Sequence, residues 1–244
     1  MSLQFAVVHE WTEDFDHACA LADRVLVETV EWLDDDSLPF HREWIGLDDD
    51  QSRLNWSSIG RKAKSLRIRI NGFIDGEIPQ PDAKAAHRAI KYIELKFPRI
   101  SGMMLIRDQD KVQSRRLGLE QVRKAHPNMA IVIGFAITER ECWILSGFDP
   151  ITHEEIASLA DERRKLGFDP RLRSEELTAG ADDTATKSPK RVCRSLLCDD
   201  GERRKRCWLE TPLALLRERG ARNGLAAFLS DVESGIAPKI GYLP

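Results

Sequence analysis

Two aspartates, Asp108 and Asp110, follow the apolar run Met103–Ile106 and are separated by one residue. Residues i and i+2 of a strand share a face, so both carboxylates could point into one cleft. Adjacent carboxylates repel each other, and a hard divalent cation commonly offsets that repulsion. The spacing predicts metal ligands at the carboxyl end of a buried strand, where open α/β sheets bind ligands. The alternative is a strand that ends in a polar turn.

Three further acids also follow apolar runs. Glu10 comes after residues 3–8, and Glu139 and Glu141 come after residues 129–137. Because the carboxyl ends of parallel strands meet at one edge of a sheet, we expect these acids near the aspartate pair. Two alternatives stay open: the later pair could simply favour the positive end of a helix, and Glu10 could be an ordinary residue at a strand end.

The elements that must position these acids alternate between strands and helices. Apolar runs predict strands, and apolar residues at helical spacing predict helices. The expected strands are 3–8, 66–70, 103–106 and 129–137, and the expected helices between them are 14–33, 82–97 and 111–125. This order predicts an α/β fold with an open, largely parallel sheet and helices on both faces.

The C-terminal part has a different pattern. Helical spacing covers 149–169, 190–197, 213–219 and 225–232, whereas 169–190 is poor in large apolar residues. The sequence therefore predicts an α/β domain over residues 1–150 and a helical extension over residues 151–244, with a mobile loop near 170–190.

The ordered acids resemble those of the TOPRIM fold, as found in small bacterial proteins related to the nuclease part of the OLD family. In that pattern a first strand ends in Glu, matched by Glu10, and a later strand ends in Asp-x-Asp, matched by Asp108 and Asp110. One branch adds a Glu-x-Glu after the next strand, matched by Glu139 and Glu141, and a helical extension. The chain departs from the pattern at Trp11, where the family has a glycine that lets backbone approach the site.

The resemblance implies a metal-dependent nuclease that uses Mg²⁺ or Mn²⁺. By this resemblance Glu10, Asp108 and Asp110 would be catalytic, and Glu139 and Glu141 would join them as metal ligands. It also implies a separate ATPase partner and a role in bacterial defence against phage or plasmid DNA. The alternative is a non-catalytic TOPRIM-like binding or regulatory subunit, in which the acids no longer support a reaction.

The charge distribution suggests where a polyanion would bind. Residues 1–60 contain fourteen Asp or Glu and three Lys or Arg, whereas residues 187–222 contain eleven Lys or Arg and five acids. The predicted nucleic-acid-binding residues, with DNA as the expected partner, are Lys190, Arg191, Arg194, Arg203, Arg204, Lys205 and Arg206. Trp208 beside them could stack on a base. The alternative is a solvated helix face with Trp208 in the core.

Several classes of function find no support in the sequence. No basic leader precedes an apolar segment, and no apolar run approaches the roughly 20 residues that span a bilayer. The five cysteines show no Cys-x-x-Cys spacing, which favours a cytoplasmic protein with free thiols. No Gly-x-x-x-x-Gly-Lys loop occurs, so any nucleotide hydrolysis would come from a partner.

Overall fold

The computed structural model describes residues 2–47, 53–70, 72–110, 112–180 and 182–242. Contacts between residues divide the chain into two compact units. The first unit comprises the described residues of 1–107, 112–134 and 230–244, and the second comprises those of 108–111 and 135–229. The boundary predicted near residue 150 falls within the second unit's range, and the assignment of domains stays a prediction.

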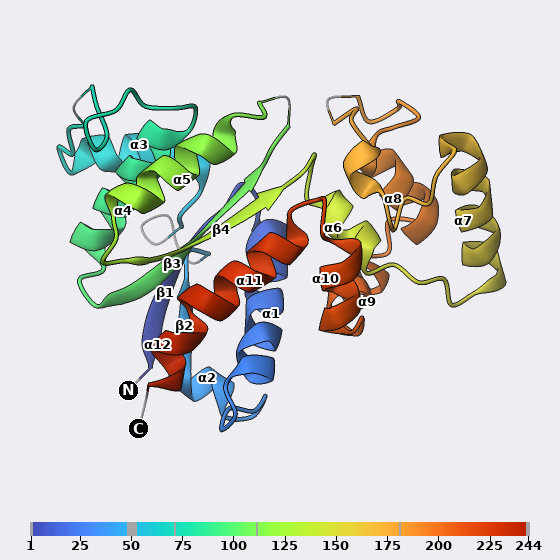
Figure 1. Ribbon diagram of the computed structural model, residues 1–244, viewed down its shortest axis with the longest axis horizontal. Coiled ribbons are helices and arrows are strands. Elements are labelled where there is room, and N and C mark those ends of the chain that lie inside the picture. The colour runs from blue at the N-terminus through green and yellow to red at the C-terminus, as the bar shows by residue number, and fades with distance from the viewer. Residues whose placement is uncertain (1, 48–52, 71, 111, 181, 243–244) are drawn as a thin grey trace. The chain divides into compact units, whose positions relative to one another are not determined.

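A four-stranded sheet forms the centre of the first unit (Figure 1). Its strands are β1 (Leu3–Val8), β2 (Arg42–Ile45), β3 (Ile100–Asp108) and β4 (Ala130–Ala136), and they lie in the order β2-β1-β3-β4. All four are parallel, which confirms the predicted α/β class and its open parallel sheet. The connections reverse direction between β1 and β3, and the carboxyl ends of two such strands flank the crevice where open sheets bind ligands.

Helices cover both faces of this sheet. Residues 5–8 of β1 and 103–105 of β3 are fully buried, as expected for strands with helices on either side. Figure 1 shows α3, α4 and α5 on one face and α1 with α12 on the other. The helices of this unit are α1 (Thr12–Thr29), α2 (Leu38–His41), α3 (Trp56–Ser65), α4 (Ala83–Lys96), α5 (Arg115–Ala125) and α12 (Ala237–Gly241).

The second unit is built from helices. They are α6 (Glu141–Ser146), α7 (His153–Leu166), the 3₁₀ helix η1 (Ser174–Glu176), α8 (Pro189–Leu197), α9 (Gly201–Leu209), α10 (Leu213–Arg219) and the first part of α11 (Leu225–Gly235). Trp143 stacks on Phe228 with ring centroids 5.2 Å apart. The buried Asn223 side chain donates to Cys142 O, Ser146 Oγ and Ser174 Oγ. One amide therefore joins three segments of this core.

The structure corrects part of the predicted element order. The strand predicted over 66–70 is wrong: these residues form a turn and a segment without regular secondary structure after α3. Arg67 has a φ of 56°, which a strand does not allow, and the Ile68 N–H donates to Ala63 O at the end of that helix. Conversely, β2 was not predicted, and α1 ends at Thr29 rather than at residue 33. The predicted start of α5, Lys111, lies outside the described residues, and the helix itself begins at Arg115.

A buried ion pair connects α7 to α8 in the second unit. Glu162 is fully buried and accepts two hydrogen bonds from Arg191, at 2.8 and 2.6 Å, and one from Ser195 at 2.9 Å. Burial alone would raise the pKa of Glu162, but these hydrogen bonds and the charge of Arg191 outweigh it, so the pKa is lowered. The carboxylate is therefore ionised in the core.

We predict that Arg191→Ala lowers the free energy of unfolding by about 3 kcal/mol, because it leaves a buried charge without its main partner. The Glu162→Met/Arg191→Met double variant should lose much less, since neither charge then remains. Urea unfolding followed by circular dichroism measures both values. A loss below about 1 kcal/mol in the single variant would contradict this account of the pair.

Candidate active site

The backbone after β3 runs beside the backbone after β4. The Gln109 N–H donates to Ala136 O at 2.8 Å, and the Asp110 N–H donates to Thr138 O at 3.0 Å. These bonds continue the parallel pairing of the two strands beyond the sheet. Asp110 is thereby held next to the residue that precedes Glu139.

Glu139 is the most unusual acid of this region. It is 2% exposed, and its Oε1 lies 3.4 Å from Lys190 Nζ. Its Oε2 is buried and has no hydrogen-bond partner among the residues that the structure describes. Gly180 packs against the same carboxylate, and a Cβ at that position would lie 2.9 Å from Oε1. Because buried carboxylate oxygens are normally hydrogen-bonded, the bare Oε2 requires an explanation.

Burial is the main cause of the unusual pKa of Glu139. Burial, followed by the negative charges of Glu141 and Asp110, raises its pKa to about 7, while Lys190 acts in the opposite direction. Burial also raises the pKa of the Cys142 thiol to about 12, and the charges of Glu141 and Asp108 contribute to this rise. The charges of Asp108, Asp110 and Glu141 thus affect the pKa of Glu139 or of Cys142, within one small region of the second unit.

Four of the five predicted site acids therefore lie in the same compact unit: Asp108, Asp110, Glu139 and Glu141. Glu10 belongs to the first unit. There it forms an ion pair with Arg107 at 2.5 Å, and Arg107 also binds Asp82 at 2.8 Å. Arg107 lies in β3, directly before Asp108. This position in the sequence indicated a possible charge partner for the acids, but the predicted acid pattern did not include it.

The donor set can be compared with the predicted Mg²⁺ or Mn²⁺. Within the described part of the chain, no group of three or more His, Cys, Asp or Glu side chains is arranged to hold a metal ion. The chemistry of the donors is nevertheless suitable, because hard cations prefer carboxylate oxygens. Glu139, beside Asp110, presents one that has no partner in the part of the chain that the structure describes. The residues fit such a cation in donor type, with Asp110 and Glu139 as the two that would hold it.

The predicted nucleic-acid-binding cluster is made of paired charges. Each of its seven cations forms an ion pair with a carboxylate of the second unit: Lys190 with Glu139, Arg191 with Glu162, Arg194 and Arg204 with Asp199, Arg203 with Glu155, Lys205 with Glu202 and Arg206 with Glu210. Trp208 is 7% exposed. Binding at this cluster would compete with the existing pairs, and its role stays a prediction. Lys190 instead emerges as a partner of the acids.

Comparison with known proteins gives no match for this chain among protein families, curated proteins or solved structures. The TOPRIM resemblance therefore rests on the ordered acids alone. None of the described helices is both long and apolar enough to cross a membrane.

We predict a pH dependence of stability from Glu139. Because its pKa is raised from 4.5 to about 7 in the folded protein, its contribution is fully present below pH 4.5 and is lost as the pH rises to 7. The Glu139→Gln variant stays neutral and does not lose this contribution. Over this pH range its free energy of unfolding should therefore rise relative to that of the wild type, by up to about 3 kcal/mol.

Chemical denaturation at several pH values, with EDTA present, measures this difference. Glu202→Gln is the matched control, because Glu202 is 83% exposed and should leave the profile unchanged. If the free energies of unfolding of the wild type and Glu139→Gln changed with pH in the same way, the pKa of Glu139 would not be raised in the folded protein.

Proposed function

We propose that this protein is a metal-dependent nuclease of TOPRIM type, which hydrolyses phosphodiester bonds in nucleic acid, with DNA as the expected substrate. The observation that carries the proposal is the buried carboxylate of Glu139, whose Oε2 has no partner among the described residues. It lies beside Asp110 at the ends of two neighbouring parallel strands. The order of the acids along the chain supports the same reading.

In this proposal each residue has a separate task. Asp110 and Glu139 hold Mg²⁺ or Mn²⁺, and Asp108 and Glu141 add negative charge that favours the bound cation. When bound, such a cation lowers the pKa of a coordinated water and stabilises charge on the phosphodiester. Lys190, 3.4 Å from Glu139, offsets part of the negative charge while no cation is present. Glu10 lies in the first unit, and its catalytic role is only what the resemblance implies.

The biological setting in the proposal comes from the resemblance. A TOPRIM nuclease of this branch would act with a separate ATPase in defence against phage or plasmid DNA. The absence of a phosphate-binding glycine loop from the sequence agrees with an ATPase on another chain. A cytoplasmic location would follow from that setting.

A second candidate function is a non-catalytic TOPRIM-like binding or regulatory subunit. The specific observation in its favour is Glu10, which is bound to Arg107. Within the described residues, no group of three or more His, Cys, Asp or Glu side chains could hold a metal ion. In this case nucleic acid would be bound and not cut.

We predict that purified protein, alone or with a co-encoded ATPase, cleaves plasmid DNA in the presence of Mg²⁺ or Mn²⁺ and not in EDTA. Asp110→Asn and Glu139→Gln should each reduce the rate by about 100-fold or more, because each removes a ligand charge. Glu202→Gln, an exposed acid outside the site, is the control and should cleave like the wild type.

Gel electrophoresis of the nicked and linear products gives the rates. Equal cleavage by the wild type and Asp110→Asn would reveal a contaminating nuclease and end the catalytic assignment. No cleavage by the wild type in any metal or with any partner would favour the binding subunit.

A further inference from the structure

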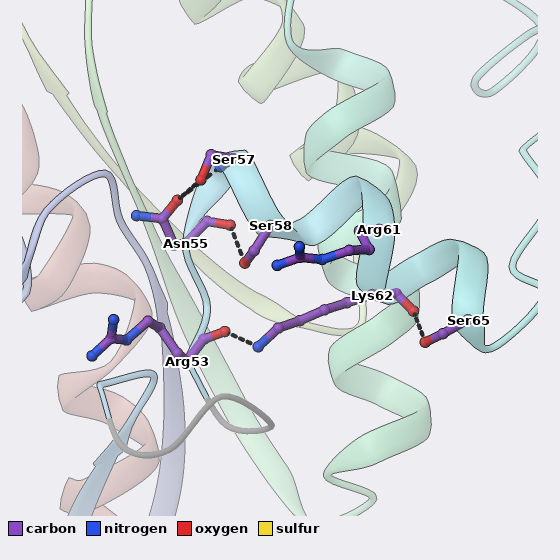
Figure 2. A pocket seen from close by; sticks show the side chains of 7 residues that line it. All are labelled: Arg53, Asn55, Ser57, Ser58, Arg61, Lys62 and Ser65. Carbon is purple, nitrogen blue, oxygen red and sulfur yellow. Dashed lines mark hydrogen bonds between the residues drawn. The ribbon is translucent and has the colours of Figure 1, made fainter.

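A pocket of about 590 Å³ lies in the first unit, against α3 and the loop before it (Figure 2). It is lined by cations and by small polar groups, among them Arg53, Asn55, Ser57, Ser58, Arg61 and Lys62. We call it the α3 pocket. This combination of guanidinium, ammonium, amide and hydroxyl donors suits an oxyanion such as a phosphate group.

The arginines of this region form no ion pairs within the described residues. Arg53 and Arg61 are exposed, and neither has a carboxylate partner in the described part of the protein. A second pocket, lined by Gly60, Lys64, Arg67, Ile68, Arg69 and Arg88, also borders α3, and its three arginines are likewise without ion pairs among the described residues. Residues 53–70 contain six Lys or Arg and no acid. The arginines of this surface thus differ from the cations of α8 and α9, which are paired with carboxylates of the second unit.

Local hydrogen bonds fix several of the side chains that line the α3 pocket. The Asn55 side chain accepts from the backbone N–H and the hydroxyl of Ser57, at 2.8 and 2.6 Å, and so caps the helix itself. The Ser58 hydroxyl donates to Asn55 O at 2.9 Å. Figure 2 shows Arg61 extending toward Ser58, while Lys62 reaches the carbonyl of Arg53. Because the helix N-terminus is capped, an anion would be bound by the side chains.

An exposed aromatic residue adjoins this pocket. Trp11 is 73% exposed and lines a neighbouring pocket that shares Asn55 and Ser57 with the α3 pocket. In the same pocket the Trp56 indole is fixed by a hydrogen bond to Ile106 O at 2.6 Å. An exposed indole next to a cationic pocket is the arrangement that stacks on a base while the adjacent phosphate is bound.

We propose that α3 and its preceding loop bind a nucleic-acid strand, with one phosphate in the α3 pocket, a second at Arg67, Arg69 and Arg88, and a base on Trp11. Two cationic pockets along one helix and an exposed indole favour a strand over a single inorganic phosphate. Trp11 follows Glu10, which lines the same pocket, but the site is separate in sequence from the acids after β3 and β4, and binding here needs no hydrolysis. The inference therefore goes beyond the proposed nuclease activity.

The test is the affinity for a short fluorescein-labelled single strand of DNA, measured by fluorescence anisotropy in EDTA at salt concentrations from about 50 to 200 mM. Arg53→Ala/Arg61→Ala and Arg67→Ala/Arg69→Ala should each weaken binding about tenfold or more and lower the slope of log K against log salt by about one for each lost phosphate contact. Trp11→Ala should weaken binding with little change in that slope, because stacking releases no counterions.

The matched control is Arg164→Ala/Arg173→Ala, which removes two exposed but ion-paired arginines and should leave affinity unchanged. Unchanged circular dichroism spectra confirm that the variants are folded. Wild-type affinity in Arg53→Ala/Arg61→Ala, or loss of binding in the control alone, would overturn the inference. Inorganic phosphate that displaces the strand at the strand's own concentration, with no effect of Arg67→Ala/Arg69→Ala, would also overturn it in favour of a single-phosphate site.

Binding and cleavage separate the two proposals. If the strand binds through α3 but is never cut, only the nuclease proposal fails. Cleavage that depends on Asp110, together with binding that ignores Arg53 and Arg61, removes the α3 surface alone.

Discussion

The two backbone hydrogen bonds that join residues 109 and 110 to residues 136 and 138 are the constraint on which the acidic site depends. They extend the β3–β4 pairing past the end of each strand, so that residues 109–110 run beside residues 136–138. Without them, Asp110 and Glu139 would be separate loop residues. With them, Asp110 lies close to the buried Glu139, and its charge adds to the burial and to the charge of Glu141 that raise the pKa of Glu139.

Most of the sheet was predictable because its strands are long apolar runs. β1, β3 and β4 were expected from such runs, and their burial on both faces accounts for the lack of alternation. β2 was missed because it has four residues and only Ile45 is buried. The alternating pattern of 66–70 was misleading: its arginines are exposed, and the chain turns at Arg67 instead of pairing with a strand. Alternation predicts a strand only when a partner strand is available.

The order of the acids along the chain was predictable from the sequence, but their ion pairs were not. The sequence indicates that acids follow three strands, and the structure gathers those after β3 and β4 in one unit. It does not indicate that Lys190 pairs with Glu139 or that Arg107 pairs with Glu10, because ion pairs join residues far apart in the chain. The same limit applies to the basic residues. A dense run over α8 and α9 proved to be internally paired, whereas the acid-free segment around α3 keeps its arginines exposed.

The most direct test of the central claim, that the acids after β3 and β4 form one cation site, is Mn²⁺ binding followed by electron paramagnetic resonance at a pH above the pKa of Glu139. We expect saturable binding to the wild type that Asp110→Asn and Glu139→Gln each abolish and that Glu202→Gln retains. Equal Mn²⁺ binding by all four proteins would contradict the claim, and so would a wild type that binds no Mn²⁺ at all.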